Sequence, residues 1–274
     1  LSAGMSSSAA ICSATAFALN KIFNTGYSLL ELAKIALVAE HKYLGVNCGL
    51  MDQFVNLFGK EGNLVKINCK TEEHQYIPFN APDVKIVLFD TGVKHNLITL
   101  GGAFKDRRKQ CQIGIELVKA AIPEVNDLTD INEEMLLKYV KPVDEQAYNR
   151  CLYIVQENER VEQVCKDLTN NDFRAVGQRM FANHYGLKNL YEVSCIECDF
   201  LVDTTKNIPG VLGSRMMGAG FGGCTINLIE NSNADSIIKS VKDVYRKQFT
   251  KDLKVYTAAI GNGTHEVECV LNTV

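Results

Sequence analysis

Leu1-Ser-Ala-Gly-Met-Ser-Ser-Ser-Ala-Ala10 is the stretch of this sequence that most constrains the fold. Its small residues run into an apolar segment, 9–23, whose spacing predicts a helix. The first backbone N–H groups of a helix have no partner inside it, and the helix dipole makes that end positive. We therefore expect an anion site there, suited to phosphate oxygens. Serine is also a good N-cap, so a plain capped helix is the alternative interpretation.

The composition is that of an ordinary soluble protein. With 274 residues, the chain is long enough for one large domain or two modest ones. Its formal net charge is −3, and it contains neither a basic run nor a long apolar span. We therefore expect no nucleic-acid partner and no membrane partner.

Cysteine usage indicates a reducing compartment. The ten cysteines are scattered among expected helices and strands, without the spacing of a small disulfide scaffold. Cys195 and Cys198 form the only C-x-x-C, which is too little for a zinc site. We expect free thiols and a cytoplasmic protein.

Hydrophobic periodicity and turn residues predict the remaining elements. Ser28 is expected to cap a helix that runs to about Tyr43. The closing strand–loop–strand–helix–strand pattern predicts an α+β layer with an antiparallel sheet and helices on one face. A domain boundary is expected near residue 92. Further helices are expected at 104–121, 132–140, 144–167, 172–185, 194–206 and 234–249, and strands at 63–69, 75–79, 84–90, 211–216, 224–229 and 253–258.

A glycine run, Met217-Gly-Ala-Gly-Phe-Gly-Gly-Cys224, separates two of these strands. It matches G-x-G-x-x-G, but a dinucleotide site needs a helix directly after the loop, and here a strand follows. So many glycines still require a cause, because each costs conformational entropy on folding. The alternatives are a tight turn between strands and a close approach of backbone to a ligand or another loop.

Two carboxylates lie near another glycine-bearing loop. Glu40 falls toward the end of an amphipathic helix, where the dipole disfavours a negative charge unless a cation compensates. A surface glutamate is the simpler interpretation. Asp52 falls at the start of a short helix, where capping alone would explain it.

The order and spacing of several motifs are specific when taken together. They are Ser6-Ser-Ser-Ala-Ala10, Ala39-Glu-His41, Cys48-Gly-Leu-Met-Asp-Gln-Phe54, Val93-Lys-His95, Arg107-Arg-Lys-Gln-Cys111, Tyr191-Glu-Val-Ser-Cys195 and Gly218-Ala-Gly-Phe-Gly-Gly-Cys-Thr225. This set resembles the galactokinase family of the GHMP small-molecule kinases over nearly the whole chain.

The resemblance implies a two-domain α+β architecture. Residues 1–92 would form the N-terminal GHMP domain, which is similar to ribosomal protein S5, and 93–274 a ferredoxin-like C-terminal domain. It also implies phosphorylation of galactose by ATP and Mg²⁺ at the C1 hydroxyl. That reaction gives galactose 1-phosphate, the first committed step of galactose catabolism.

The family's functional residues map onto this sequence as expectations. Asp52 matches the catalytic base, and Ser8 and Glu40 match the magnesium ligands. The glycine run matches a motif that packs against the phosphate loop. The expected nucleotide contacts are Gly4, Met5, Ser6, Ser7, Ser8 and Ala9, and the expected sugar contacts are Gly49, Asp52 and Phe104.

The sequence departs from the family pattern in three ways. The family's G-E-H-x-D sugar segment and an assisting arginine would fall upstream of Leu1, so we expect 1–274 alone not to phosphorylate galactose. Phe104 stands where the family usually has a tyrosine, and Ala219 replaces a glycine, which requires a negative φ there. A kinase for a related sugar such as N-acetylgalactosamine, or a non-catalytic sensor of galactose and ATP, is the alternative function. Such sensors can lose residues of the serine–alanine loop, which is retained here.

Overall fold

The computed structural model describes residues 6–45, 48–93 and 97–267. Within these ranges the chain forms two compact units. The smaller unit comprises residues 6–79 with the segment from 259 onward, and the larger comprises 80–258. No helix in the described ranges is both long enough and apolar enough to span a bilayer.

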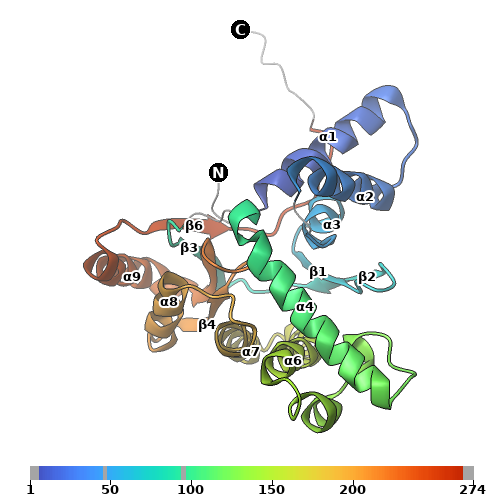
Figure 1. Ribbon diagram of the computed structural model, residues 1–274. Coiled ribbons are helices and arrows are strands. Elements are labelled where there is room, and N and C mark those ends of the chain that lie inside the picture. Colours follow the sequence, from blue (N-terminus) through green and yellow to red (C-terminus); the bar gives the residue numbers. More distant parts are fainter. Residues whose placement is uncertain (1–5, 46–47, 94–96, 268–274) are drawn as a thin grey trace. The chain divides into compact units, whose positions relative to one another are not determined.

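Three helices build the smaller unit (Figure 1). They are α1 (Ser7–Phe23), α2 (Leu29–Ala39), which continues into a π-helical turn (Glu40–Leu44), and α3 (Met51–Phe58). Leu32 and Ala33 of α2 and Leu57 of α3 form their common core. The expected start of α2 is confirmed, because Ser28 Oγ accepts from the Glu31 N–H at 3.3 Å while the Glu31 carboxylate accepts from the Ser28 N–H at 2.8 Å.

A hairpin and the C-terminal segment complete the smaller unit. Strands β1 (Asn63–Ile67) and β2 (His74–Pro78), which lie within two residues of the expected ranges, pair antiparallel. Beyond residue 258 the chain binds the end of α3. The Gly263 N–H donates to the Gly59 carbonyl at 2.7 Å, and the Thr264 N–H donates to the Asn56 carbonyl at 2.7 Å.

The larger unit contains an antiparallel four-stranded sheet in the order β4 (Val211–Met216), β5 (Cys224–Glu230), β3 (Val84–Asp90), β6 (Lys254–Ala258). Strand β3 is central, with Val87 opposite Asn227 on one side and Thr257 on the other. One face carries Val87, Phe89 and Ile229, which pack against α8 (Ile196–Lys206) and α9 (Ala234–Phe249). The expected antiparallel sheet with helices on one face is confirmed.

A helical region precedes β4 in the larger unit (Figure 1). Its helices are α4 (Leu97–Ala121), α5 (Glu133–Met135) with a π-helical turn (Leu136–Val140), α6 (Glu145–Thr169) and α7 (Phe173–Gly186) with a second π-helical turn (Leu187–Tyr191). Short 3₁₀ turns lie at Leu128–Asp130 and Asn231–Asn233. Asp144 and Asp172 cap α6 and α7, accepting from the Ala147 and Ala175 N–H groups at 2.9 and 3.0 Å.

Two expected boundaries differ from the observed ones by more than two residues. Helix α4 begins at Leu97 instead of Phe104, because the glycines at 101 and 102 weaken the helical pattern without ending the helix. The compact units divide after Phe79, before the expected boundary at 92, because β3 pairs with β5 and β6. The family-level division into 1–92 and 93–274 stays a prediction.

Candidate active site

The start of α1 presents backbone donors. Ser6 has φ 49° and ψ 40°, and its carbonyl accepts from the Ala10 N–H at 3.0 Å. Its side chain makes no capping hydrogen bond, so the simple serine-cap interpretation is wrong. The N–H groups of the first turn, which begins at Ser7, are those that a helix leaves without internal partners. This end of α1 therefore suits an anion. Gly4 and Met5 lie outside the described residues.

Glu40 lies in a buried position at the junction of α2 and its π-helical turn. The residue is 4% exposed, so the interpretation as a surface glutamate is wrong. Its Oε2 accepts hydrogen bonds from Nε2 of Gln53 at 2.7 Å and from Sγ of Cys48 at 3.1 Å. Its Oε1 is buried and has no hydrogen-bond partner within the described residues. Burial raises the pKa of the Cys48 thiol, and the hydrogen bond with Glu40 raises it further, to about 11.

Helix α1 carries Ser8, the other expected magnesium ligand, in its first turn. Cys12 follows Ser8 by one helical turn, so the two side chains share a face. Burial raises the pKa of the Cys12 thiol, and the negative charge of Glu40 raises it further. Cys12 therefore lies within electrostatic range of Glu40. Binding of one magnesium ion by Ser8 and Glu40 together stays a prediction.

The donor set at this point fits Mg²⁺. A hydroxyl and a carboxylate are hard oxygen ligands, and Mg²⁺ usually takes only one or two protein ligands besides phosphate oxygens and water. The buried Oε1 of Glu40 is the orphaned acceptor that such an ion would satisfy. Glu40 also lies one turn before its helix ends, where the dipole favours a cation. Among the described residues, no group of three or more His, Cys, Asp or Glu side chains could hold a metal ion.

Asp52 occupies the first turn of α3. The N-cap of this helix is Leu50, without a side-chain cap, so the capping interpretation of Asp52 is wrong. Its half-buried carboxylate makes no hydrogen bond or ion pair within the ranges that the structure describes, while its backbone carbonyl accepts from Nδ2 of Asn56 at 2.7 Å. Asp52 directly precedes Gln53, which contacts Glu40. The hydrogen bond between Gln53 and Glu40 therefore attaches the expected metal ligand to the first turn of α3, which also carries Asp52.

The two other expected sugar contacts lie in different surroundings. Gly49 is exposed in the loop before α3, and a Cβ added to it would meet open space. Phe104 is half-buried on α4 in the larger unit. Its ring packs edge-on against Phe221, with centroids 5.5 Å apart. Sugar contact at Gly49 and at Phe104 stays a prediction.

The glycine turn between β4 and β5 owes its composition to close backbone approaches. A Cβ on Gly220 would lie 2.2 Å from the Val193 carbonyl oxygen, and one on Gly222 would lie 2.9 Å from that of Val93. Both glycines have positive φ, 99° and 138°. Ala219 does not adopt a positive φ, as its side chain requires. The approach of the turn to other loops confirms the sequence-based expectation, whereas its contact with a phosphate loop stays a prediction.

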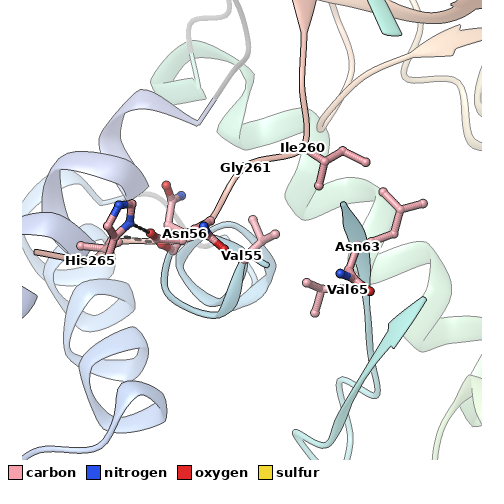
Figure 2. Close-up of a pocket in the computed structure, with 12 residues that line it drawn as sticks. Val55, Asn56, Asn63, Val65, Ile260, Gly261 and His265 are labelled. Carbon is pink, nitrogen blue, oxygen red and sulfur yellow. Dashed lines mark hydrogen bonds between the residues drawn. The ribbon is translucent and has the colours of Figure 1, made fainter. Parts of the chain in front are cut away.

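A separate cavity of about 550 Å³ lies beside α3 in the smaller unit (Figure 2). Val55 and Asn56 of α3, Asn63 and Val65 of β1, and residues 260–265 line it. Figure 2 shows His265 on the opposite side of Asn56 from the hairpin residues. Ser8, Glu40 and Asp52 are not among its lining residues, so the cavity is not the expected catalytic site.

Sequence reasoning did not single out Gln53 or Cys48 as parts of the site. Both fall inside the motif Cys48-Gly-Leu-Met-Asp-Gln-Phe54, but their individual roles depend on contact with Glu40. One signal was available. Gln53 directly follows the expected base within this motif.

Two family models match the chain and define its class. The model for the GHMP kinases N terminal domain matches residues 1–60, and the model for the GHMP kinases C terminal matches residues 162–247. The fold also resembles that of mevalonate kinase from L. major, with a TM-score of 0.59, 20% identity, and coverage of 94% of this chain and 66% of that one. The chain is thus built as a GHMP kinase.

Relatives at higher identity narrow this class. The chain is 35% identical to galactokinase from Fusobacterium nucleatum over 269 residues, covering 97% of this chain and 68% of that one. It is 35% identical to galactokinase from Thermotoga maritima over 267 residues, covering 97% and 73%. The structure of Lactococcus lactis galactokinase complexed with galactose matches with a TM-score of 0.91, 29% identity, and coverage of 97% and 68%. The chain belongs to the galactokinase family.

Proposed function

We propose that this protein transfers the γ-phosphate of ATP to the C1 hydroxyl of galactose, with Mg²⁺, and so makes galactose 1-phosphate. The observation that carries the proposal is the similarity to galactokinases over 97% of the chain. The substrate follows from these relatives and from the Lactococcus lactis protein, which was solved with galactose. Family membership alone supports the broader statement that the protein is a sugar kinase.

The nucleotide phosphates would lie at the start of α1. Residues Gly4 to Ala9 would form the phosphate loop, with backbone N–H groups as donors. Support comes from the first turn of α1, which begins at Ser7 without a side-chain cap on Ser6. Small side chains on Ser7, Ser8 and Ala9 would let phosphate oxygens approach the backbone closely.

Ser8 and Glu40 would hold Mg²⁺ together with phosphate oxygens. When bound, the ion neutralises charge that develops on the transferred phosphoryl group. Support comes from the buried, unpartnered Oε1 of Glu40 and from Cys12, one helical turn after Ser8, whose thiol pKa is raised by burial and by the Glu40 charge. A buried carboxylate oxygen without a partner is costly, which favours a bound cation.

Asp52 would accept the proton of the galactose C1 hydroxyl as that oxygen attacks the γ-phosphate. A general base needs an oxygen that is not already engaged, and no described residue hydrogen-bonds the Asp52 carboxylate. Catalysis would then consist mainly of positioning and charge neutralisation.

We also propose a cytoplasmic location. Within the described ranges, none of the nine cysteines forms a disulfide. Thiols persist in reducing compartments, where cytosolic kinases and their ATP are found.

The test is a coupled ADP-release assay on the intact protein with ATP, Mg²⁺ and single sugars. We expect galactose-dependent ADP release that stops when the metal is chelated, and a galactose 1-phosphate product by NMR. Faster turnover of N-acetylgalactosamine than of galactose would identify N-acetylgalactosamine as the substrate. Nucleotide and galactose binding without any ADP release would point instead to a sensor and would overturn the kinase proposal.

A further inference from the structure

The two carboxylate oxygens of Glu40 have opposite surroundings. Oε2 receives two donors, Nε2 of Gln53 at 2.7 Å and Sγ of Cys48 at 3.1 Å. Oε1 is buried and receives none within the described residues. Gln53 is itself fully buried, so its amide is not available to solvent. The carboxylate is therefore fixed through one oxygen while the other stays open.

We propose that Gln53, assisted by Cys48, is a positioning residue that holds Oε2 of Glu40 so that Oε1 is directed to the Mg²⁺ of the bound nucleotide. This inference rests on the proposed function, in which Glu40 is a metal ligand. Gln53 and Cys48 do not contact the metal in this proposal. They act by setting the orientation of the ligand.

The chemistry of the side chains supports this division of roles. A glutamate side chain rotates about three bonds, and an unrestrained carboxylate presents either oxygen to a cation. Two donors on Oε2 remove that freedom before the metal arrives, so less conformational entropy is lost on binding. An amide N–H and a thiol both donate to a carboxylate without adding charge, which leaves the full negative charge of Glu40 for the cation.

The position of Gln53 in the chain adds a second consequence. Gln53 follows Asp52 directly in the first turn of α3, whose N-cap is Leu50. The hydrogen bond to Glu40 therefore links the end of α2 to the turn that carries the proposed base. The hydrogen bond that restrains the proposed metal ligand therefore also restrains the helical turn on which the proposed base lies.

The principal test replaces the amide by a side chain of similar size without a donor. In Gln53→Met, the affinity for Mn²⁺ in the presence of a non-hydrolysable ATP analogue, measured by electron paramagnetic resonance, should fall about 10–100-fold, as is usual when an outer partner of a metal ligand is lost. The matched control is Gln156→Met. Gln156 also donates its amide to a glutamate, Glu133, at 2.8 Å, but on an exposed surface of the larger unit. The Mn²⁺ affinity of the Gln156→Met variant should stay unchanged.

A double-substitution cycle separates positioning from general support of the fold. Glu40→Gln should weaken Mn²⁺ binding on its own, and adding Gln53→Met should then change the affinity less than about twofold. If the fold-losses of Mn²⁺ affinity in the two single variants multiply in the double variant, Gln53 does not act through Glu40 and the positioning role is overturned. Unchanged Mn²⁺ affinity in Glu40→Gln would overturn the metal role of Glu40 and the proposed function of this site with it. Weak binding in Glu40→Gln but normal binding in Gln53→Met would overturn only the present inference.

Cys48 provides a test that does not depend on the folding of a Gln53 variant. Cys48→Ser keeps a donor of similar size, and Cys48→Ala removes it. We expect Cys48→Ser to bind Mn²⁺ with the analogue as the unsubstituted protein does, and Cys48→Ala to bind it about fivefold more weakly, the equivalent of one ordinary hydrogen bond. Equal affinity in the two variants would exclude Cys48 from the positioning role.

Discussion

Thr91 donates twice to the carbonyl oxygen of Gly223, through its backbone N–H at 3.0 Å and its hydroxyl at 2.7 Å. These bonds attach the end of β3 to the glycine turn between β4 and β5. The Gly223 N–H in turn donates to the Val93 carbonyl at 3.1 Å, and the Phe221 N–H donates to that of Val193 at 2.6 Å. The turn is therefore hydrogen-bonded both to the segment after β3 and to Val193. Gly220 and Gly222 are required because a side chain there would collide with these neighbouring segments.

Gly220→Ala should destabilise the larger unit by roughly 2–4 kcal/mol. The added Cβ would lie 2.2 Å from the Val193 carbonyl, and φ at this position is 99°. Urea unfolding followed by circular dichroism measures the change. Gly102→Ala in α4 is the control, since a Cβ there meets nothing within 4 Å. It should leave stability equal or higher, by up to about 1 kcal/mol, because alanine favours a helix. Similar losses in both variants would contradict the steric explanation.

Glu40→Gln should make turnover depend on a higher Mg²⁺ concentration. Removing the charge that would bind the cation should raise the half-saturating Mg²⁺ concentration at least about tenfold, which corresponds to ~1.4 kcal/mol. The fold should persist, because an amide oxygen can accept from Gln53 and Cys48 in place of Oε2. Turnover is measured across a Mg²⁺ series at saturating ATP, and added Mg²⁺ should partly restore the rate. Wild-type behaviour at low Mg²⁺ would exclude Glu40 as a ligand.

Asp52→Asn should separate catalysis from stability. Asp52 does not cap α3, so its loss removes only a favourable interaction with the helix dipole, worth at most about 1 kcal/mol. Loss of the general base should lower turnover about 10²–10⁴-fold. Steady-state kinetics and thermal unfolding are measured on the same preparation. If activity declined only in proportion to the folded fraction, the role of Asp52 would be structural.

The larger unit should lose stability in acid, because the interactions of the Asp199 carboxylate are lost when it is protonated. Burial raises the pKa of its carboxyl, but hydrogen bonds from His184, Ser194 and Lys188 lower it more, so the net shift is downward. The folded state then binds the proton less tightly than the unfolded chain, in which an aspartate has a pKa of about 3.9. The stabilisation is present above that pH and is lost as the pH falls below it. Asp199→Asn should therefore cost about 1–3 kcal/mol at pH 7 and less at pH 3.

The control for this pH dependence is Asp203→Asn. Its carboxylate is half exposed and lies 3.7 Å from the Lys188 ammonium, so solvent screens the interaction. Less than about 1 kcal/mol should be lost at either pH. Urea unfolding at pH 7 and pH 3 compares the two variants. Equal pH dependence in both would mean that Asp199 is not the group responsible.

Local patterns determined most of the secondary structure. The predicted range of α9 equals the observed one, Ser28 caps α2 as predicted, and α6 and α7 begin within one residue of their predicted starts. Caps and periodicity depend on residues only three or four positions apart, so the sequence records them directly. The order of the motifs also identified the family, because each motif is a short run of residues.

Tertiary structure decided what depends on distant segments. Strand β3 lies between β5 and β6, with Asn227 of β5 donating to the Val87 carbonyl at 3.0 Å, and no local pattern specifies a pairing across 140 residues. The same holds at Glu40. Its position in the helix was readable from the sequence, but its burial and its hydrogen bond with Gln53, 13 residues further along the chain, were not. Packing alone decides which oxygen of that carboxylate is engaged and which stays open, because hydrogen-bond partners are chosen by distance in space.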